Sequence, residues 1–347
     1  FEVAMAGIVA HDDDAVTKRE LDWIGTMAKE TGLTATFIVL QHNQDPLRWR
    51  REMDTAAKWR AEGAKVVPLV AGRPFGVLLG LETRNPFRLR PSYEAIAHLP
   101  VDQRIVAMRD PQVRAAILAE EPVDDDETKM LGQKGLEMVL PRCYVLESGV
   151  EPDYEQDPSR SLGALAQARG TTPMEIAYDA LTASDEPTML LLPLFNYADG
   201  NHDALYDQMM DDAAILGLAD GGAHCGAICD ASIPTYVLTH WVKGRSRGPR
   251  LTLEDGVRRL TSQPADVYGL TDRGRIEPGK RADLNVIDLD NLQLMAPHAV
   301  YDLPAGGMRL LQDARGYDAT VVAGVITRRH GVDTGARPGR LVTNSAA

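Results

Sequence analysis

The first 75 residues of this 347-residue chain alternate short apolar runs with segments of helical periodicity. The strand-length runs occupy residues 1–5, 36–40 and 65–70. Between them, apolar side chains recur at helical spacing over 15–29, and a second helical segment runs from about Pro46 to Glu62. Strands separated by helices form parallel sheets through right-handed crossovers. The pattern therefore predicts an α/β fold built on a parallel sheet.

After the third strand the chain loses this rhythm. Pro-containing and acidic stretches are interspersed with short helical segments, which predicts a large insertion at about 76–187. Strand signals return at 188–192, and an apolar run over 213–218 leads to Asp220. From Gly274 the pattern changes to short β segments with turns. We therefore expect a first domain over 1–273, which includes the insertion, and a β-rich module over 274–347.

Charge and composition exclude several classes of protein. The 50 acidic and 37 basic residues give a formal charge of -13, which would repel nucleic acid and anionic lipid. No apolar run approaches the roughly 20 residues of a membrane helix, and no signal-peptide pattern opens the chain. We therefore expect no nucleic-acid or membrane partner and a cytoplasmic location. Residues 1–5 already read as a strand, so we expect the chain to begin within a domain.

Polar side chains follow three of the predicted strands. His42, Arg73 and Asp220 come directly after apolar runs. In parallel sheets and barrels, ligands bind at the carboxyl ends of the strands, so these residues are candidates for one shared site. An imidazole and a carboxylate can bind Zn²⁺, which lowers the pKa of a bound water toward about 7, and a guanidinium suits a substrate carboxylate.

Each candidate also has a plain structural interpretation. Asp220 precedes two glycines, so it could be a turn residue or a helix cap. His42 could be a hydrogen-bonded, half-buried histidine, and Arg73 could pair with Glu82. Taken singly, none of the three residues decides between structure and function.

The three cysteines add little. Cys143, Cys225 and Cys229 are too few for a disulfide framework. His224, Cys225 and Cys229 resemble a zinc knuckle only superficially, because no second ligand pair exists. A nucleophilic Cys225 activated by His224 is the other alternative, but adjacent side chains in an extended segment point apart.

Several linked strings resemble the amidohydrolase superfamily, and within it the N-acyl-D-amino-acid deacylase (D-aminoacylase) branch. The strings are Gly217-Leu-Ala-Asp220-Gly-Gly-Ala-His224, Leu260-Thr-Ser-Gln-Pro-Ala265 with Tyr268-Gly-Leu270, and Gly274-Arg-Ile-Glu-Pro-Gly-Lys-Arg-Ala-Asp-Leu284. The segments that end at His42 and Pro74 resemble later barrel strands of the same branch. The resemblance covers nearly the whole chain.

This resemblance implies a (β/α)₈ TIM barrel, here its second half, with a small β-sandwich module completed by residues 274–347. It implies one or two zinc ions, with Asp220 as metal ligand and proton shuttle, His42 as the strand-six metal ligand and His11 as the alternative for strand five. It also implies hydrolysis of an N-acyl amino acid or a related amide, with Arg73 and His224 orienting the substrate. An assembly of identical subunits is compatible with the sequence.

The sequence departs from the family pattern in two ways. Family members carry a His-x-His pair on the first barrel strand, and this chain has none. A full barrel needs about 250 residues, whereas only four strand units precede the β-rich module. The expected partner is therefore a missing N-terminal barrel half. The alternatives are a cyclic-amide hydrolase or deaminase of the same superfamily, and a non-catalytic half-barrel that only completes such a partner.

Overall fold

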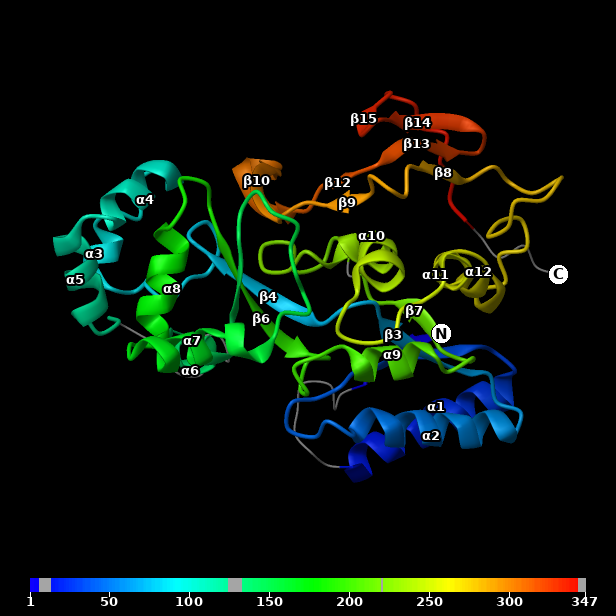
Figure 1. Ribbon diagram of the computed structural model, residues 1–347. Coiled ribbons are helices and arrows are strands. Elements are labelled where there is room, and N and C mark those ends of the chain that lie inside the picture. The colour runs from blue at the N-terminus through cyan, green and yellow to red at the C-terminus, as the bar shows by residue number, and fades with distance from the viewer. Residues whose placement is uncertain (6–13, 124–132, 220, 343–347) are drawn as a thin grey trace.

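The computed structural model of the protein describes residues 1–5, 14–123, 133–219 and 221–342 (Figure 1). Its central element is a four-stranded parallel sheet in the order β1-β2-β3-β7. These strands are β1 (Glu2–Val3), β2 (Ala35–Val39), β3 (Val66–Ala71) and β7 (Ile215–Gly217). β2 and β3 are almost wholly apolar and buried, as strands covered on both faces must be. The predicted α/β fold with a parallel sheet is confirmed.

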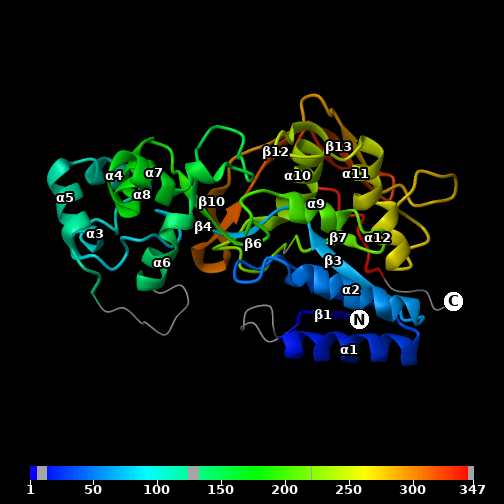
Figure 2. The same ribbon diagram turned by 60° about the horizontal axis from the view of Figure 1, so that its bottom comes forward.

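Two helices connect the first three strands. They are α1 (Asp14–Thr31) and α2 (Arg48–Ala61), which lie side by side in both ribbon views (Figures 1 and 2). The helices approach closely because Gly25 of α1 has no side chain: a β-carbon placed there would lie 2.1 Å from the indole of Trp59. Gly32 follows α1 with a φ of 69°, a left-handed conformation that glycine reaches without strain.

The insertion forms a separate lobe with its own sheet and core, at the left of Figure 1. Its strands β4 (Phe75–Gly80), β6 (Met189–Phe195) and β5 (Tyr144–Leu146) pair antiparallel in that order. Its helices are α3 (Pro91–Glu94), α4 (Val101–Met108), α5 (Pro111–Ala119), α6 (Gln133–Val139), α7 (Leu162–Arg169) and α8 (Pro173–Thr182), with the 3-10 turns η2 (Leu140–Arg142) and η3 (Pro158–Arg160). The strand signal at 188–192 thus belongs to this lobe, not to the parallel sheet.

A run of helices surrounds β7 in the sequence. They are α9 (Asp203–Met209) before it, and η4 (Asp230–Ser232), α10 (Ile233–Tyr236), the π-helix η5 (Val237–Gly244), α11 (Leu253–Leu260) and α12 (Ser262–Val267) after it. The Thr252 hydroxyl accepts a hydrogen bond from the Asp255 amide at 3.1 Å and caps α11. The helices after β7 lead the chain toward the β-rich module.

Residues beyond 274 form the β-rich module at the top of Figure 1. Its strands are β8 (Leu284–Ile287), β9 (Gln293–Leu294), β10 (His298–Leu303), β11 (Gly307–Leu311), β12 (Ala314–Arg315), β13 (Tyr317–Val322), β14 (Val325–Arg329) and β15 (Val332–Asp333), with the 3-10 turn η6 (Pro304–Gly306). β13 and β14 form an antiparallel hairpin, whose turn residues Ala323 and Gly324 both have positive φ. That is the turn geometry favoured in two-residue hairpins.

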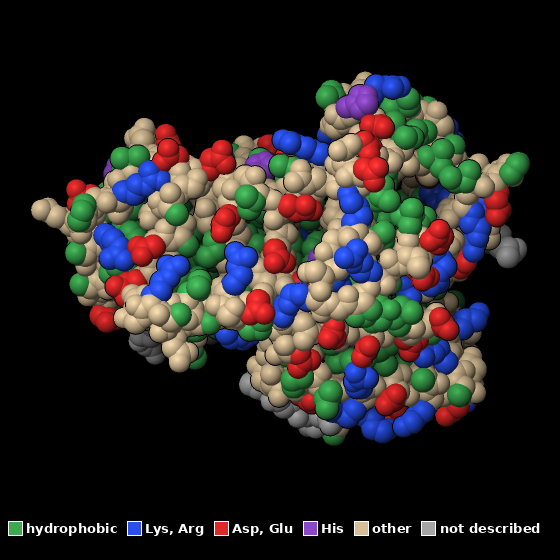
Figure 3. All heavy atoms as spheres, in the orientation of Figure 1, with side chains coloured by type: hydrophobic (Ala, Val, Ile, Leu, Met, Phe, Trp, Pro, Cys, Tyr) green, Lys and Arg blue, Asp and Glu red, His purple; other side chains and the backbone are tan. Residues whose placement is uncertain are grey.

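The surface is mixed in charge. Acidic and basic side chains are interspersed over the face drawn in Figure 3, although the chain as a whole is acidic. Among the described helices, none is both long enough and apolar enough to cross a lipid bilayer.

Candidate functional site

His42 lies three residues beyond β2, at the carboxyl edge of the parallel sheet. Its side chain is buried, and its ring packs edge-to-face on Phe195 with 5.2 Å between the centroids. The preceding residue, Gln41, is held by the end of β6, because its backbone amide donates to the Asn196 side-chain oxygen at 2.7 Å. The strand end that carries His42 is therefore fixed against the end of β6.

Arg73 follows β3 at the same edge, and its guanidinium is already engaged. It is 2% exposed and forms an ion pair with Asp230 at 3.0 Å. It also donates to the Cys229 carbonyl at 2.5 Å, and its guanidinium carbon lies 4.0 Å from the centroid of the Tyr154 ring. The predicted partner Glu82 is not among these contacts. The proposed role of Arg73 in substrate binding stays a prediction.

The remaining predicted site residues follow the first and last strands of the sheet. Asp220 and His11 lie outside the described residues. His224 is exposed with a φ of 48°, and its carbonyl accepts hydrogen bonds from the amides of Ala227 and Ile228. β2, β3 and β7 are adjacent and parallel, so their carboxyl ends lie along the same edge of the sheet. His42, Arg73 and the residues after Gly217 each come after one of these strand ends.

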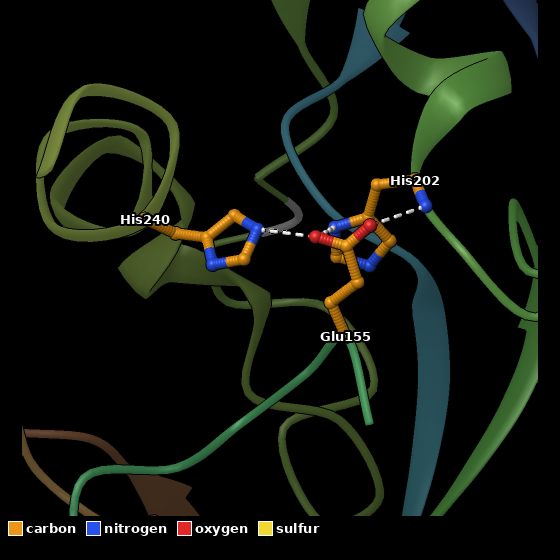
Figure 4. Close-up of side chains that lie close together, drawn as sticks. All are labelled: Glu155, His202 and His240. Carbon is orange, nitrogen blue, oxygen red and sulfur yellow. Dashed lines mark hydrogen bonds and ion pairs between the residues drawn. The ribbon is translucent and has the colours of Figure 1, made fainter. Parts of the chain in front are cut away.

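A second group of titratable side chains lies together in the described residues: Glu155, His202 and His240 (Figure 4). Glu155 comes from the insertion, His202 precedes α9, and His240 is on η5. One Glu155 oxygen is 2.9 Å from His240 Nε2 and 3.6 Å from His202 Nδ1. Their ligand-type atoms lie within 4.8 Å of one another, a spacing that a metal ion could bridge.

The carboxylate of Glu155 is, however, fully hydrogen-bonded by protein groups. Arg245, whose side chain is 0% exposed, donates Nε and Nη2 to the two Glu155 oxygens at 3.0 Å each. The backbone amide of His202 donates at 2.8 Å, and His240 supplies the fourth bond. A carboxylate offers about four lone-pair sites, so all of them are used. A divalent cation at this position would also face the Arg245 guanidinium, so the group does not fit a metal as it is arranged.

Electrostatics agree with a salt-bridge network. Burial alone would raise the pKa of Glu155, but hydrogen bonds from His240 and Arg245 outweigh it and hold that pKa well below the usual range. Burial lowers the pKa of His202 to about 3, so its imidazole is neutral at pH 7. In the neutral ring Nε2 donates to the Tyr154 carbonyl at 3.1 Å, and Nδ1 has no hydrogen-bond partner among the described residues.

Sequence reasoning gave no hint of this network. Glu155, His202, His240 and Arg245 are spread over 91 residues (155 to 245) and form no motif of fixed spacing. Only the folding of the insertion back onto the helices on both sides of β7 brings them together, and no local sequence signal predicts that.

Comparison with protein-family models matches residues 3–328 to the model described as Amidohydrolase family. Among curated proteins, an N-acyl-D-glutamate deacylase of Alcaligenes xylosoxydans xylosoxydans is 40% identical over 70 residues. That alignment covers 20% of this chain and 13% of the relative.

Two solved structures illustrate the structural likeness. A D-aminoacylase studied for the role of its binuclear metal centre matches with a TM-score of 0.47 and 15% identity, over 96% of this chain and 54% of that one. An N-acyl-D-glutamate deacylase from Bordetella bronchiseptica, complexed with zinc and a phosphonate inhibitor, matches with a TM-score of 0.44 and 16% identity, over 90% and 50%. At these scores neither structure defines the fold of this chain, which spans about half the length of each.

Proposed function

The chain belongs to the amidohydrolase family, and on that basis we propose that it is part of a metal-dependent enzyme that hydrolyses an amide C–N bond. The observation that carries the proposal is the family match, which extends over residues 3–328. The proposed substrate class is an N-acyl-D-amino acid. It rests on the curated relative, an N-acyl-D-glutamate deacylase that is 40% identical over 70 residues, and on the strings around Asp220.

The proposed metal is zinc, one ion or two, with His42 and Asp220 as ligands. His11, which follows the first strand in the sequence, is the alternative ligand for strand five. His42 suits this role because it offers an imidazole, a donor type that zinc prefers, at the carboxyl edge of a parallel sheet. Zinc bound there would polarise the amide carbonyl and lower the pKa of a coordinated water.

Asp220 carries the proton transfers in this proposal. Its carboxylate takes a proton from the attacking water as the water oxygen bonds to the amide carbon. The same carboxyl then gives that proton to the nitrogen as the C–N bond breaks, which releases a carboxylic acid and an amine. His224 and Arg73 would orient the substrate, with Arg73 restricted by its existing bonds to Asp230 and Cys229.

We further propose that the parallel sheet is the second half of a TIM barrel, with a missing N-terminal half as its partner. Two observations support this. In the described part of the chain, β1 and β7 each pair with only one strand, so both outer edges are open. β7 also borders a largely apolar cavity of about 800 Å³, which reaches β8, an edge strand of the four-stranded sheet in the β-rich module. Unpaired edges beside apolar surface are where further strands add.

The test is an assay of the purified protein, with all of its natural chain, on N-acetyl-D-glutamate, N-acetyl-L-glutamate and a cyclic amide such as a hydantoin. We expect hydrolysis of the N-acetyl-D-amino acid, loss of activity on chelation and recovery with Zn²⁺. Replacing His42 by Ala should lower bound zinc, whereas His98→Ala, at an exposed histidine of the insertion, should not. Preferred hydrolysis of the cyclic amide would favour the alternative function, and full activity after complete metal removal would contradict the proposal.

A further inference from the structure

Two consecutive residues of the insertion contact the chain that follows β7. We call residues 221–245 the post-β7 segment; it contains His224 and Cys225 and ends at Arg245, directly after η5. The Tyr154 ring meets Tyr236 of this segment edge-to-face at 5.5 Å, and Tyr154 also lies under Arg73. The next residue, Glu155, binds His240 and Arg245. The insertion therefore contacts the segment at successive points along it.

The beginning of the segment is tied to the insertion as well. The backbone amide of Leu78, in β4, donates to the Ala227 carbonyl at 2.8 Å. Arg73, which Tyr154 covers, binds the Cys229 carbonyl and the Asp230 carboxylate. Residues 221–229, which lie between β7 and η4 and form no helix or strand, thus depend on contacts made by other parts of the molecule.

We propose that Glu155 is a positioning residue: a metal-free clamp that holds the post-β7 segment, with His224, against the insertion. This inference rests on the proposed function, which places the chemistry directly before and within that segment. Its basis is the bidentate bond from the buried Arg245, together with the bonds from His240 and the His202 amide. Because four donors converge on one buried carboxylate, loss of its charge leaves the buried Arg245 with only the exposed carboxylate of Asp203, at 2.6 Å, as counter-ion.

Cys225 provides a reporter of this clamp that does not depend on activity. It is the only partly exposed thiol among the three cysteines, and it lies in the post-β7 segment. Burial raises the pKa of Cys143 to about 12 and that of Cys229 to about 11. Thiolates are the reactive form, so iodoacetamide should modify Cys225 first, and peptide mass spectrometry identifies the modified site.

The experiment compares Glu155→Asp and Glu155→Gln with Glu147→Gln, a matched control on an exposed glutamate of the same lobe whose ion pair with Arg160 spans 3.8 Å. Glu155→Asp keeps the charge but cannot reach all four donors, so it provides a folded variant if Glu155→Gln does not fold. We expect Cys225 alkylation to rise by about tenfold or more in the Glu155 variants through local opening. Bound metal should equal that of the wild type, and the control should match the wild type in both measurements.

Two further readouts separate positioning from other roles. If N-acetyl-D-glutamate is hydrolysed, kcat should fall in Glu155→Asp with little change in KM, because the clamp acts through the segment and not on the substrate. Loss of bound metal in the Glu155 variants would overturn the proposal and make the cluster a metal site. Unchanged alkylation of Cys225 would overturn it too. The metal and alkylation measurements are informative even if the protein hydrolyses no amide, so failure of the proposed function is distinguishable from failure of the clamp.

Discussion

A buried histidine without charge makes the stability of this protein depend on pH. His202 is 0% exposed, and Glu155, His240 and Arg245 lie around it. Burial, the largest effect, lowers the pKa of His202 to about 3, whereas in the unfolded chain the pKa stays near its ordinary value of 6.5. Between these values the unfolded state binds the extra proton.

Where the unfolded state holds more protons than the folded state, the free energy of unfolding falls as pH falls, by about 1.4 kcal/mol per pH unit for one full proton. We expect this slope to appear below about pH 6.5 and to become shallower in His202→Gln by about that amount. Denaturant unfolding at pH 7, 6 and 5 measures it. His98→Gln, at an exposed position, should keep the wild-type slope; an unchanged slope in His202→Gln would show that His202 does not stay neutral.

At the scale of elements, the sequence predicted strands and helices better than it predicted their partners. The periodicity of residues 15–29 and the apolar runs of β2 and β3 are local, so α1 and the parallel strands follow from them. The run at 188–192 indicated a strand, but the apolar sequence of a strand does not show with which other strands it pairs. Pairing with β4 and β5 is a long-range choice that places β6 in the insertion lobe.

The open edge of β7 carries a prediction at this scale. An edge strand exposes amides to solvent, whereas a strand paired on both sides does not. We expect amide hydrogen exchange in β7 to slow by about tenfold or more when the preceding barrel half is present. β2, which is paired on both sides already, is the internal control. If β7 exchanges equally fast with and without the preceding half, barrel closure at this edge is ruled out.

At the scale of the whole molecule, three parts meet at the post-β7 segment. Arg73, which follows the parallel sheet, binds Cys229 and Asp230, the insertion supplies Tyr154 and Glu155, and the β-rich module donates the Leu310 amide to the Cys225 carbonyl at 2.6 Å. His42 and Arg73 could be proposed from sequence because each follows an apolar strand. Glu155 could not, because its partners are set by tertiary packing alone.

The variant Asp220→Asn tests most directly whether Asp220 carries the proton transfers, as proposed. Asparagine has nearly the same shape but cannot accept the proton of the attacking water. We predict that the variant, at equal bound zinc and equal thermal stability, loses N-acetyl-D-glutamate hydrolysis by a factor of about 10² to 10⁴, the usual contribution of a general acid–base group. Hydrolysis at the wild-type rate by metal-loaded Asp220→Asn would contradict the proposed role.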